Sequence, residues 1–579
     1  MKNSLIWWES DNKAQSIEAC VNNLMAQLKP TQQQRRRNAE MYGDNVLWSY
    51  FHTAGLGSAI QTPRLQMNNN ELNVVRSAID ALTAKVAKVK VRPAYLTDDG
   101  SWDEQQLAEE LNNAVAATFY DVDFYTKARQ VFRHACVFDT GCLKFVASPD
   151  NKSIQAEIVL VSELLVDQVE ATSGQITQLH QVKYAPRATL LKLYPDQAKA
   201  INQAPSFSSP SSASASISDV IRVTESWKLN NTHVISIPNQ VLAEESWPHD
   251  FFPFSFFKYQ ENLLGFYGVS VAQILQPYQF HINRVTHVIN VSQELCAVPR
   301  VYIKNASNIV AEFINAEVGS IINHDGDVPS FNTATAQNPE MYQYQRYLTE
   351  KAFEQVGLSQ SYIGGTKTPG VNAAVAIREV NDIQNDRQAA VALAWEQFAI
   401  DSAKVIVELG ASQGIKRFKL AKSKANMDSL KLKVWPTNLL PDSPGGRLAT
   451  VTEMIQAGMI KPDMAIDLLG FPDIDAFRSM VNASIELTKK QITKMLKTGN
   501  YIPPEPSQNL EQSFKMAQDA QLRAQIDDMP EDRIELLLRY QDDCNRLIEF
   551  AKSAQSPQEQ IAPMAQPMAA PVSDLLPIA

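Results

Sequence analysis

The feature that most constrains the fold of this chain is a pair of long amphipathic segments that enclose a short β-rich segment between residues 265 and 363. In the first segment, apolar side chains recur at helical spacing until Pro299 ends the pattern. We place its start near Pro277, because proline is tolerated in the first turn of a helix and not further in. Such a helix is a rod about 33 Å long. Its apolar side chains form two neighbouring stripes: Tyr278, Ile282, Val285, Ile289 and Cys296, and then Val288, Val291, Leu295 and Val298.

Two further helices are expected after the first one, from about Pro339 to Val356 and from about Asn372 to Leu409. Between the first and second helices, the runs VYI and GSII are typical of short strands. A glycine-rich loop, residues 364–371, separates the second helix from the third. Its glycines and Pro369 permit an exposed loop that adapts its shape.

The 264 residues before the first long helix alternate between helical and strand-like patterns. The expected elements are helices within 11–42, 71–90 and 102–137, and strands between 141 and 185 and between 220 and 246. Residues 203–218 are rich in serine, proline and alanine, and such a segment buries too little apolar surface to offset its ordering entropy, so we predict a mobile surface loop. Arg35, Arg36 and Arg37 are expected on a solvated helix face, with a contact to DNA or to a neighbouring subunit as the alternative.

The segment after the third helix continues with one strand and then with helices. Leu430 to Thr437 alternates as a strand does, and we expect it to return to the sheet of the N-terminal part. Helical patterns fill most of residues 443–552. The tail, residues 553–579, is rich in proline, alanine, glutamine and methionine and is expected to be disordered in isolation. These patterns together predict an α+β chain that is mostly helical.

Composition agrees with a large structural subunit. Apolar residues make up 45% of the 579 residues and charged residues 20%, so the chain can bury substantial cores. Its net charge of −10 argues against tight non-specific binding of DNA, because neutralised phosphates supply most of that affinity. The five cysteines have irregular spacing, which disfavours a disulfide framework. We also expect no transmembrane helix, since no stretch approaches 18 uninterrupted apolar residues.

Motifs of enzymatic chemistry are missing. No G-x-x-x-x-G-K-[ST] phosphate loop occurs, so ATP hydrolysis is not expected. Ser270 lies in a run that resembles a nucleophile elbow but lacks the second glycine, and a helix N-cap is the simpler interpretation. His281 and His287 are six residues apart, which does not suit a pair of metal ligands on one helix. Two acidic pairs are interpreted as a helix entry and a turn: Asp121 with Asp123, and Asp325 with Asp327. We therefore expect no enzyme, no cofactor and no metal site.

The order of these segments resembles the portal proteins of tailed bacteriophages, the head-to-tail connectors, and the podovirus type in particular. Helix, small β segment, returning helix, glycine loop and very long helix correspond to the stem, clip, second stem helix, tunnel loop and tunnel helix of that family. The resemblance covers about residues 30–480 and depends on order and spacing rather than on one invariant motif. Its local support comes from four runs: Trp247 to Phe256, Gly265 to Ser270, Glu354 to Ser359, and Asn73 to Pro93.

The resemblance implies a subunit with a wing, a stem, a clip and a helical crown that assembles into a ring. It divides the chain into an N-terminal wing (1–264), first stem helix (265–298), clip (299–337), second stem helix (338–363), tunnel loop (364–371), tunnel helix (372–411), a return to the wing (412–442), crown (443–552) and tail (553–579). The implied function is structural: a dodecameric ring at one capsid vertex forms the channel through which viral DNA is packaged and ejected.

The resemblance also implies partners and a location. The partners are further copies of the chain, double-stranded DNA in transit, the large subunit of the terminase, a head–tail adaptor, and capsid or scaffold protein, with no membrane. The protein would be part of the virion after assembly in the cytoplasm of a bacterial host. The alternative is a cytoplasmic helical scaffold or adaptor without a DNA channel. A nucleic-acid enzyme is a further competitor, against which the missing catalytic residues argue.

Three groups of candidate residues follow from this resemblance. They are the DNA-facing tunnel loop (Gly364, Gly365, Thr366, Lys367 and Thr368), the polar stem residues that would line the channel (Asn283, Thr286, Asn290 and Gln293), and the clip residues that would dock partners (Arg300, Lys304, Glu312 and Glu317). We expect the Lys367 loop to touch DNA in transit or to hinder its backsliding. The alternative is that Lys367 is an ordinary solvated lysine.

Overall fold

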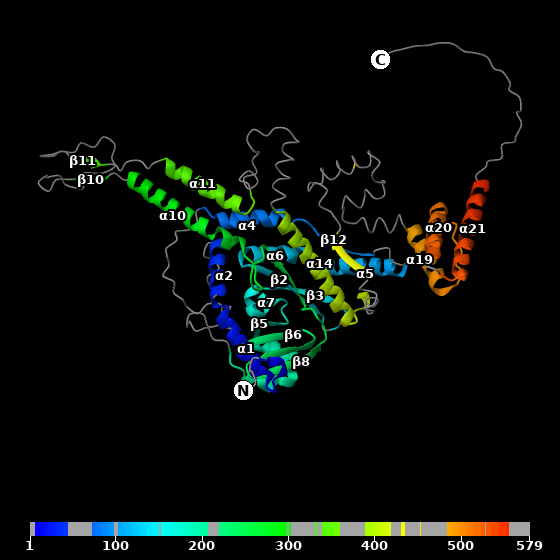
Figure 1. The fold of residues 1–579 in the computed structure, drawn as a ribbon, viewed down its shortest axis with the longest axis horizontal. Helices are drawn as coiled ribbons and strands as arrows, with labels where there is room; N and C mark the ends of the chain where they lie inside the picture. Colours follow the sequence, from blue (N-terminus) through cyan, green and yellow to red (C-terminus); the bar gives the residue numbers. More distant parts are fainter. Residues whose placement is uncertain are drawn as a thin grey trace, which may run out of the picture. The chain divides into compact units, whose positions relative to one another are not determined.

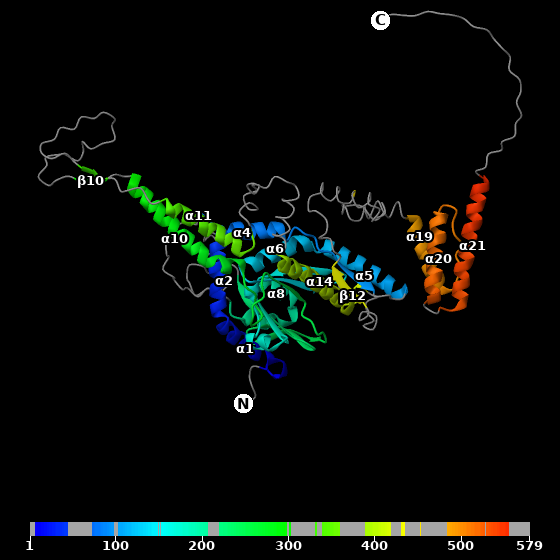
Figure 2. The same cartoon turned by 45° about the horizontal axis from the view of Figure 1, so that its top comes forward.

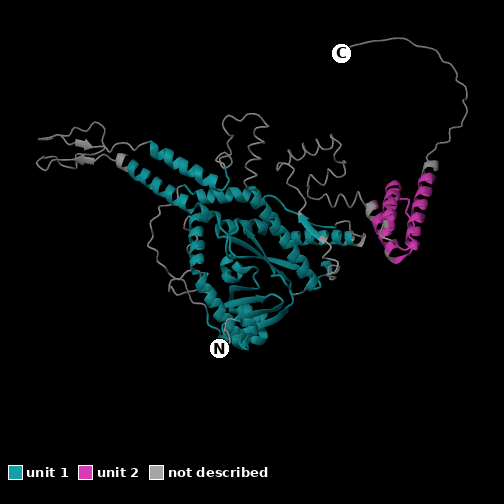
Figure 3. Cartoon of the chain, viewed as in Figure 1, with its two compact units in different colours: residues 1–100, 104–435 teal, residues 101–103, 436–579 magenta. Residues whose placement is uncertain are grey.

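The structure is a computed structural model, and it is a mixed α+β fold with more helix than strand, as the sequence predicts (Figure 1). It describes residues 6–43, 72–97, 102–148, 150, 152–206, 219–297, 300–302, 330–332, 339–358, 388–418, 430–434, 452, 483–526 and 529–554. The chain divides into two compact units (Figure 3). Unit 1 comprises residues 1–100 and 104–435, and unit 2 comprises residues 101–103 and 436–579.

The described helices of unit 1 lie mostly where helical spacing predicts them, although one, at residues 168–173, falls in the range 141–185 where strands are expected. They are α1 (Lys13–Gln27), α2 (Lys29–Tyr42), α4 (Val74–Lys85), α5 (Trp102–Asp121), α6 (Phe124–Val137), α7 (Gln168–Ser173), α8 (Arg187–Leu193), α9 (Ala198–Gln203), α10 (Val271–Ala297), α11 (Glu340–Gln355) and α14 (Ala389–Ser412). The expected third long helix, 372–411, is described only from residue 388 onward, and its described part continues to Ser412.

Two larger antiparallel sheets form most of the described β part of unit 1. The larger has the order β4-β5-β6-β7-β8, with β4 (Leu164–Leu165), β5 (Gln178–Pro186), β6 (Val220–Lys228), β7 (Asn231–Ile237) and β8 (Gln240–Trp247); the smaller has the order β3-β2-β9, with β2 (Thr140–Ala147), β3 (Ile154–Val159) and β9 (Phe254–Lys258). Asn230 and Asn239 have positive φ angles of 55° and 67° in the tight turns on either side of β7. Asparagine tolerates this left-handed conformation, which lets three successive strands pair directly.

An aromatic cluster packs α6 and α14 against the smaller sheet. The ring centroids of Phe132 on α6 and Phe257 on β9 are 5.0 Å apart, and Trp395 on α14 lies 5.5 Å from Phe132. Ser402 of α14 adds a polar contact, because its Oγ donates to Ser255 Oγ of β9 at 2.9 Å. Residues from three distant parts of the sequence therefore share one core.

The strand expected near Leu430 is present as β12 (Leu430–Val434), but it does not join either larger sheet. It pairs antiparallel with β1 (Pro93–Thr97), and Tyr95 faces Leu432 in the register. The backbone of Tyr95 also bonds Asn112 of α5, whose Oδ1 accepts from the Tyr95 N–H at 2.7 Å. The expectation that this strand returns to the sheet of the N-terminal part is therefore corrected to a separate two-stranded sheet.

The described part of unit 2 is a group of three helices, α19 (Ala483–Thr498), α20 (Leu510–Ile526) and α21 (Glu531–Ala554). They enclose a small core that includes Ile492, Leu537 and Tyr540. The Tyr540 hydroxyl donates to Gln491 Oε1 at 2.8 Å, which satisfies a buried polar pair. Because α21 reaches Ala554, the first two residues of the predicted disordered tail are helical, while residues 555–579 lie outside the described residues.

The predicted mobile loop, 203–218, is partly described. Gln203 ends α9, and Arg187 donates to the carbonyl oxygen of Ala204 at 2.9 Å and to Ser206 Oγ at 3.0 Å. The start of this segment is therefore held by a side chain of α8, and residues 207–218 lie outside the described residues. Four cysteines are buried and free: Cys20, Cys136, Cys142 and Cys544.

A buried histidine makes the stability of unit 1 depend on pH. His180 is fully buried, with Nδ1 at 2.7 Å from Ser226 Oγ and Nε2 at 3.7 Å from Cys20 Sγ. Burial lowers the pKa of His180 to about 4. The unfolded chain, with a histidine pKa of about 6.5, binds the proton first, so stability is complete above that pH and falls as the pH decreases toward 4. The slope for one such group is about 1.4 kcal/mol per pH unit.

We therefore expect the urea-unfolding free energy of unit 1 to decrease between pH 6.5 and pH 4.5, and to decrease less steeply in His180→Asn. Some slope remains in the variant, because burial also lowers the pKa of His134 to about 4. Equal slopes in wild type and variant would contradict this account.

Candidate functional site: a helical hairpin and its buried base

Helices α10 and α11 form an antiparallel hairpin that extends from the rest of unit 1 (Figures 1 and 2). Between them in the sequence lie two short strands, β10 (Arg300–Tyr302) and β11 (Ser330–Asn332), which pair antiparallel with Val301 opposite Phe331. Strand β10 overlaps the predicted run VYI, whereas β11 follows the predicted run GSII, which lies outside the described residues. The segment between the two strands, residues 303–329, lies outside the described residues.

Helix α10 begins six residues earlier than expected. Ser270 is its N-cap: the hydroxyl oxygen accepts from the Gln273 N–H at 3.0 Å, and the residue is fully buried. Pro277 therefore lies inside the helix. The first turn is nonetheless favourable, because the side chains of Val271, Ala272 and Leu275 are all fully buried in the core. The interpretation of Ser270 as a helix cap is confirmed.

Gln279 of α10 satisfies the first backbone groups of α4. Its Oε1 accepts from the Val74 N–H at 2.9 Å and lies 3.4 Å from the Val75 nitrogen, and its Nε2 donates to the carbonyl oxygen of Leu72 at 2.9 Å. The side chain is almost fully buried. Because the first N–H groups of a helix have no partner within the helix, one glutamine joins α10 to α4.

A buried ion pair holds the segment that leads into α10. The guanidinium of Arg35 on α2 donates to both carboxylate oxygens of Asp139, at 2.7 and 3.2 Å. The same guanidinium lies 4.3 Å from the ring centre of Tyr267, whose hydroxyl donates to the carbonyl oxygen of Leu164 at 2.9 Å. Burial raises the pKa of the Asp139 carboxyl, and Arg35 opposes that shift. We refer to residues 267–279, with these partners, as the hairpin base.

The burial of Arg35 corrects an expectation. Only 2% of its surface is exposed, so it lies on neither a solvated face nor a surface that DNA or another subunit could reach. Its neighbours in the sequence differ: Arg36 pairs with Glu40 at 3.0 Å, and Arg37 is exposed. One turn after Arg35, Asn38 Nδ2 donates to Ser270 Oγ at 2.9 Å. The inward face of α2 is therefore polar, and it faces the hairpin base.

Close backbone contact at the hairpin base requires a glycine. The Gly268 N–H donates to Thr140 Oγ1 at 3.2 Å. A Cβ atom at this position would lie 2.8 Å from the carbonyl oxygen of Asp139 and 2.9 Å from that of Gln260. Both neighbours are backbone atoms, so a larger residue here would displace the segment that precedes α10.

The four side chains predicted to line a channel are all on α10, and two of them contact α11. Thr286 Oγ1 accepts from Gln345 Nε2 at 2.7 Å, and Gln293 Nε2 donates to the Tyr342 hydroxyl at 2.7 Å. Asn283 Oδ1 accepts from Gln279 Nε2 at 2.8 Å, and Asn290 is half-buried. The sequence pattern marked these positions as polar, but it does not show that the partner of Thr286 and Gln293 is the returning helix.

The other candidate residues are mostly outside the described part of the chain. Arg300 lies in β10 opposite Asn332. The loop residues Gly364, Gly365, Thr366, Lys367 and Thr368 and the clip residues Lys304, Glu312 and Glu317 lie outside the described residues, as do Asp325 and Asp327.

The remaining titratable candidates do not converge on one site. His281 and His287 are exposed on α10. Asp123 occupies the N-cap position of α6 with a positive φ of 53° and makes no capping hydrogen bond, whereas Asp121 pairs with Arg417. Within the described residues, no group of three or more side chains is arranged to hold a metal ion.

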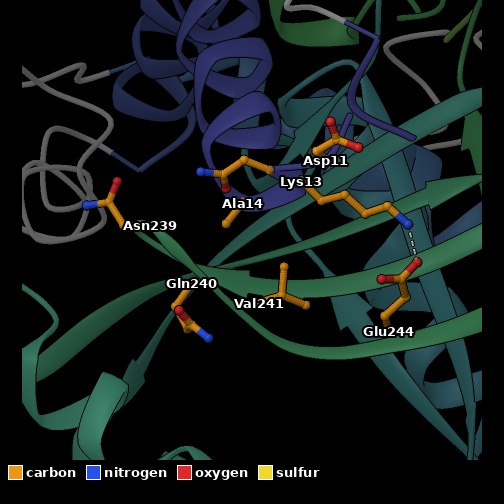
Figure 4. Close-up of a pocket in the computed structure, with 8 residues that line it drawn as sticks. Asp11, Lys13, Ala14, Asn239, Gln240, Val241 and Glu244 are labelled. Atoms are coloured by element: carbon orange, nitrogen blue, oxygen red, sulfur yellow. Dashed lines mark hydrogen bonds and ion pairs between the residues drawn. The ribbon is translucent and has the colours of Figure 1, made fainter. Parts of the chain in front are cut away.

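A shallow hollow of about 280 Å³ lies between the start of α1 and the β7–β8 turn (Figure 4). Lys13 reaches across it and forms an ion pair with Glu244. These two charges neutralise each other, and Asp11 is the one further charged side chain of the lining. The α10–α11 hairpin is therefore a better candidate for a functional site than this hollow.

Sequence reasoning missed Gln279 of the hairpin base and did not predict that Arg35 is buried there. Gln279 had a signal, because it interrupts an apolar stripe between Leu275 and Ile282 at helical spacing. Arg35 had none, since the residues around it are polar.

The chain was also compared with known proteins. No protein-family model matches it, and no curated protein is detectably similar to it. Among the described helices, none has the length and apolar composition that crossing a bilayer requires.

Replacing Gln279 with leucine tests the hairpin base. In the variant, the Val74 N–H and the carbonyl oxygen of Leu72 keep their mutual bond at 3.1 Å, but they lose the side-chain bonds to Gln279, and the buried N–H of Val75 loses its acceptor. We expect this loss to lower the unfolding free energy by about 1–3 kcal/mol. The measurement is urea unfolding, with Gln343→Leu on the exposed side of α11 as the matched control. A Gln279→Leu protein as stable as this control would show that the hydrogen bonds of Gln279 add nothing.

Proposed function

We propose that this chain is the subunit of a bacteriophage portal, a ring that forms the channel for packaging and ejecting viral DNA at one capsid vertex. One observation supports it most: a helical hairpin with a small paired β element between its helices, joined to an α+β body by a buried polar base. The choice of the portal family is supported by the order of segments in the sequence, which includes the glycine-rich loop and the long helix that follows it.

The buried base suits a subunit that must repeat identically around an axis. A ring closes only when every copy presents its contact surfaces at the same angle. Buried, directional contacts at both α2 and α4 limit how α10 can leave the body. A flexible connection would give each copy a different angle and would disfavour closure.

The negative net charge of the chain suits a channel through which DNA slides rather than a protein that binds DNA tightly. With a net charge of −10, it lacks the excess of cations that traps DNA through its phosphates. In this proposal the segment between α10 and α11 docks the terminase large subunit and later the head–tail adaptor. The body contacts capsid or scaffold protein, and twelve copies form the ring in the virion. The chain itself performs no catalysis.

Electron microscopy of the purified full-length protein tests the proposal. We expect class averages viewed along the symmetry axis to show closed rings with a central channel wide enough for duplex DNA. A compact oligomer without a channel would instead support the alternative, a helical scaffold or adaptor.

The proposed role of Lys367 has a separate test. If the loop touches DNA in transit, Lys367→Ala should reduce the amount of DNA retained in filled particles, because a cation near the phosphates is lost from every subunit. DNA content per particle is the measurement, and Lys192→Ala, at an exposed lysine of α8, is the control for loss of a lysine elsewhere. Normal filling and retention would remove the role of Lys367 and leave the portal proposal intact.

A further inference from the structure

The hairpin has two outer edges that face away from each other, one on each helix. On α10, Thr286 and Gln293 point to α11. At about 100° per residue, Arg284 and Val291 lie on the opposite side of this helix. The α10 outer edge consists of Phe280, His281, Arg284, His287, Val288 and Val291, all of them exposed.

The second edge is on α11. Leu348 and Ala352 are buried on the inner side of this helix, and Gln345 contacts Thr286. The opposite side is exposed and combines tyrosines with carboxylates. The α11 outer edge consists of Glu340, Tyr344, Tyr347, Glu350 and Glu354.

Both edges expose large apolar or aromatic side chains. Val288 and Val291 on the α10 edge are 40% and 38% exposed. On the α11 edge, Tyr344 and Tyr347 are 47% and 52% exposed. Several such residues together on one helix side are typical of a contact surface rather than of single solvated residues.

The two edges have opposite charge. From Val271 to Gln293, α10 contains no aspartate or glutamate, and its outer edge has Arg284 and two histidines. The α11 outer edge has three glutamates. Lys351 on the same side of this helix pairs with Glu354 and lies over the Tyr347 ring, so Glu340 and Glu350 keep the edge negative. Arg284 and Glu350 each have no hydrogen bond or ion pair within the described residues. The electrostatic complement of each edge is therefore the other edge of the same hairpin.

We propose that the α10 outer edge of one copy of this chain docks on the α11 outer edge of a second copy, head to tail. Because the edges face opposite directions, one hairpin cannot bring its own edges together. A contact between two different surfaces of identical subunits repeats from copy to copy and closes into a ring when the rotation permits. The inference rests on the proposed function, in which copies surround a channel, and it assigns the residues that join them.

The hydrogen bonds within the hairpin predict which residues meet. Thr286 lies level with Gln345, and Gln293 lies level with Tyr342. Because the helices are antiparallel, Arg284 lies level with the stretch from Tyr347 to Glu350. Docked side by side without an axial shift, Arg284 of one copy meets Glu350 of the next. Val288 and Val291 then pack against Tyr344.

Burial and charge have different roles in this contact. Exposed ion pairs add little affinity by themselves, so burial of the tyrosines and valines supplies most of it. The charges select the orientation, since two α10 edges or two α11 edges would bring like charges together. This selection favours the head-to-tail contact over a two-fold one.

A charge exchange in the full-length protein tests the contact. We expect Arg284→Glu and Glu350→Arg each to weaken self-association by about tenfold or more, because each variant places like charges opposite one another. The double variant restores the pair with its charges exchanged and should recover association. Lys192→Glu, an exposed charge reversal on α8, is the matched control and should associate as the wild type does.

Self-association is measured by sedimentation velocity at low salt, and the ring fraction by electron microscopy. All variants should keep the wild-type unfolding midpoint, because both residues are exposed. Single variants that associate as wild type, or a double variant no better than the singles, would overturn the contact. A wild type that stays monomeric would overturn it as well. If the wild type forms rings with an open channel but the charge exchange does not change its association, the contact alone is refuted. If the charge exchange changes association as expected but no channel forms, the portal function is refuted.

Discussion

The placement of the hairpin depends on the buried ion pair between Arg35 and Asp139. Both side chains are almost completely buried, at 2% and 6% exposure. Removing either partner of such a pair leaves an uncompensated charge in the interior, which typically costs about 3–5 kcal/mol. The pair joins α2 to the segment before β2, and the ring of Tyr267 covers it at the start of the hairpin base. The ion pair thereby joins α2, the start of β2 and the start of the hairpin base, which are distant in the sequence.

Two more contacts fix the direction in which the hairpin leaves the rest of unit 1. Asn38 reaches the capping hydroxyl of Ser270, and Gln279 satisfies the first backbone groups of α4. Hydrogen bonds of this kind have preferred angles, whereas apolar packing alone permits sliding. The hairpin is therefore joined to the body by contacts that specify its direction. Edges that face outward at a constant angle are the condition that a repeating, head-to-tail assembly requires.

Local patterns predicted much of the fold and less of the candidate site. The strands of the larger sheet follow alternation of apolar and polar residues, and α11 has the expected helical spacing. The start of α10 was misplaced because a local rule for proline was overridden by burial of the preceding turn. The apolar stripe containing Ile282 and Ile289 is buried as its spacing suggests, but Val288 and Val291 of the neighbouring stripe are exposed. Spacing identifies a stripe, and only the packing shows how much of it a neighbour covers.

The sequence by itself determined the type and order of the elements: helix, paired strands, returning helix, and the mixed body that precedes them. These follow from periodicity and turn chemistry, which act over a few residues. The tertiary structure alone decided which polar residues are buried and what they bind. Arg35 meets Asp139 across 104 residues of sequence, and Gln279 meets Val74 across 205. Such partners are brought together by the packing of whole elements, so no local pattern around Arg35 could distinguish it from the exposed Arg37.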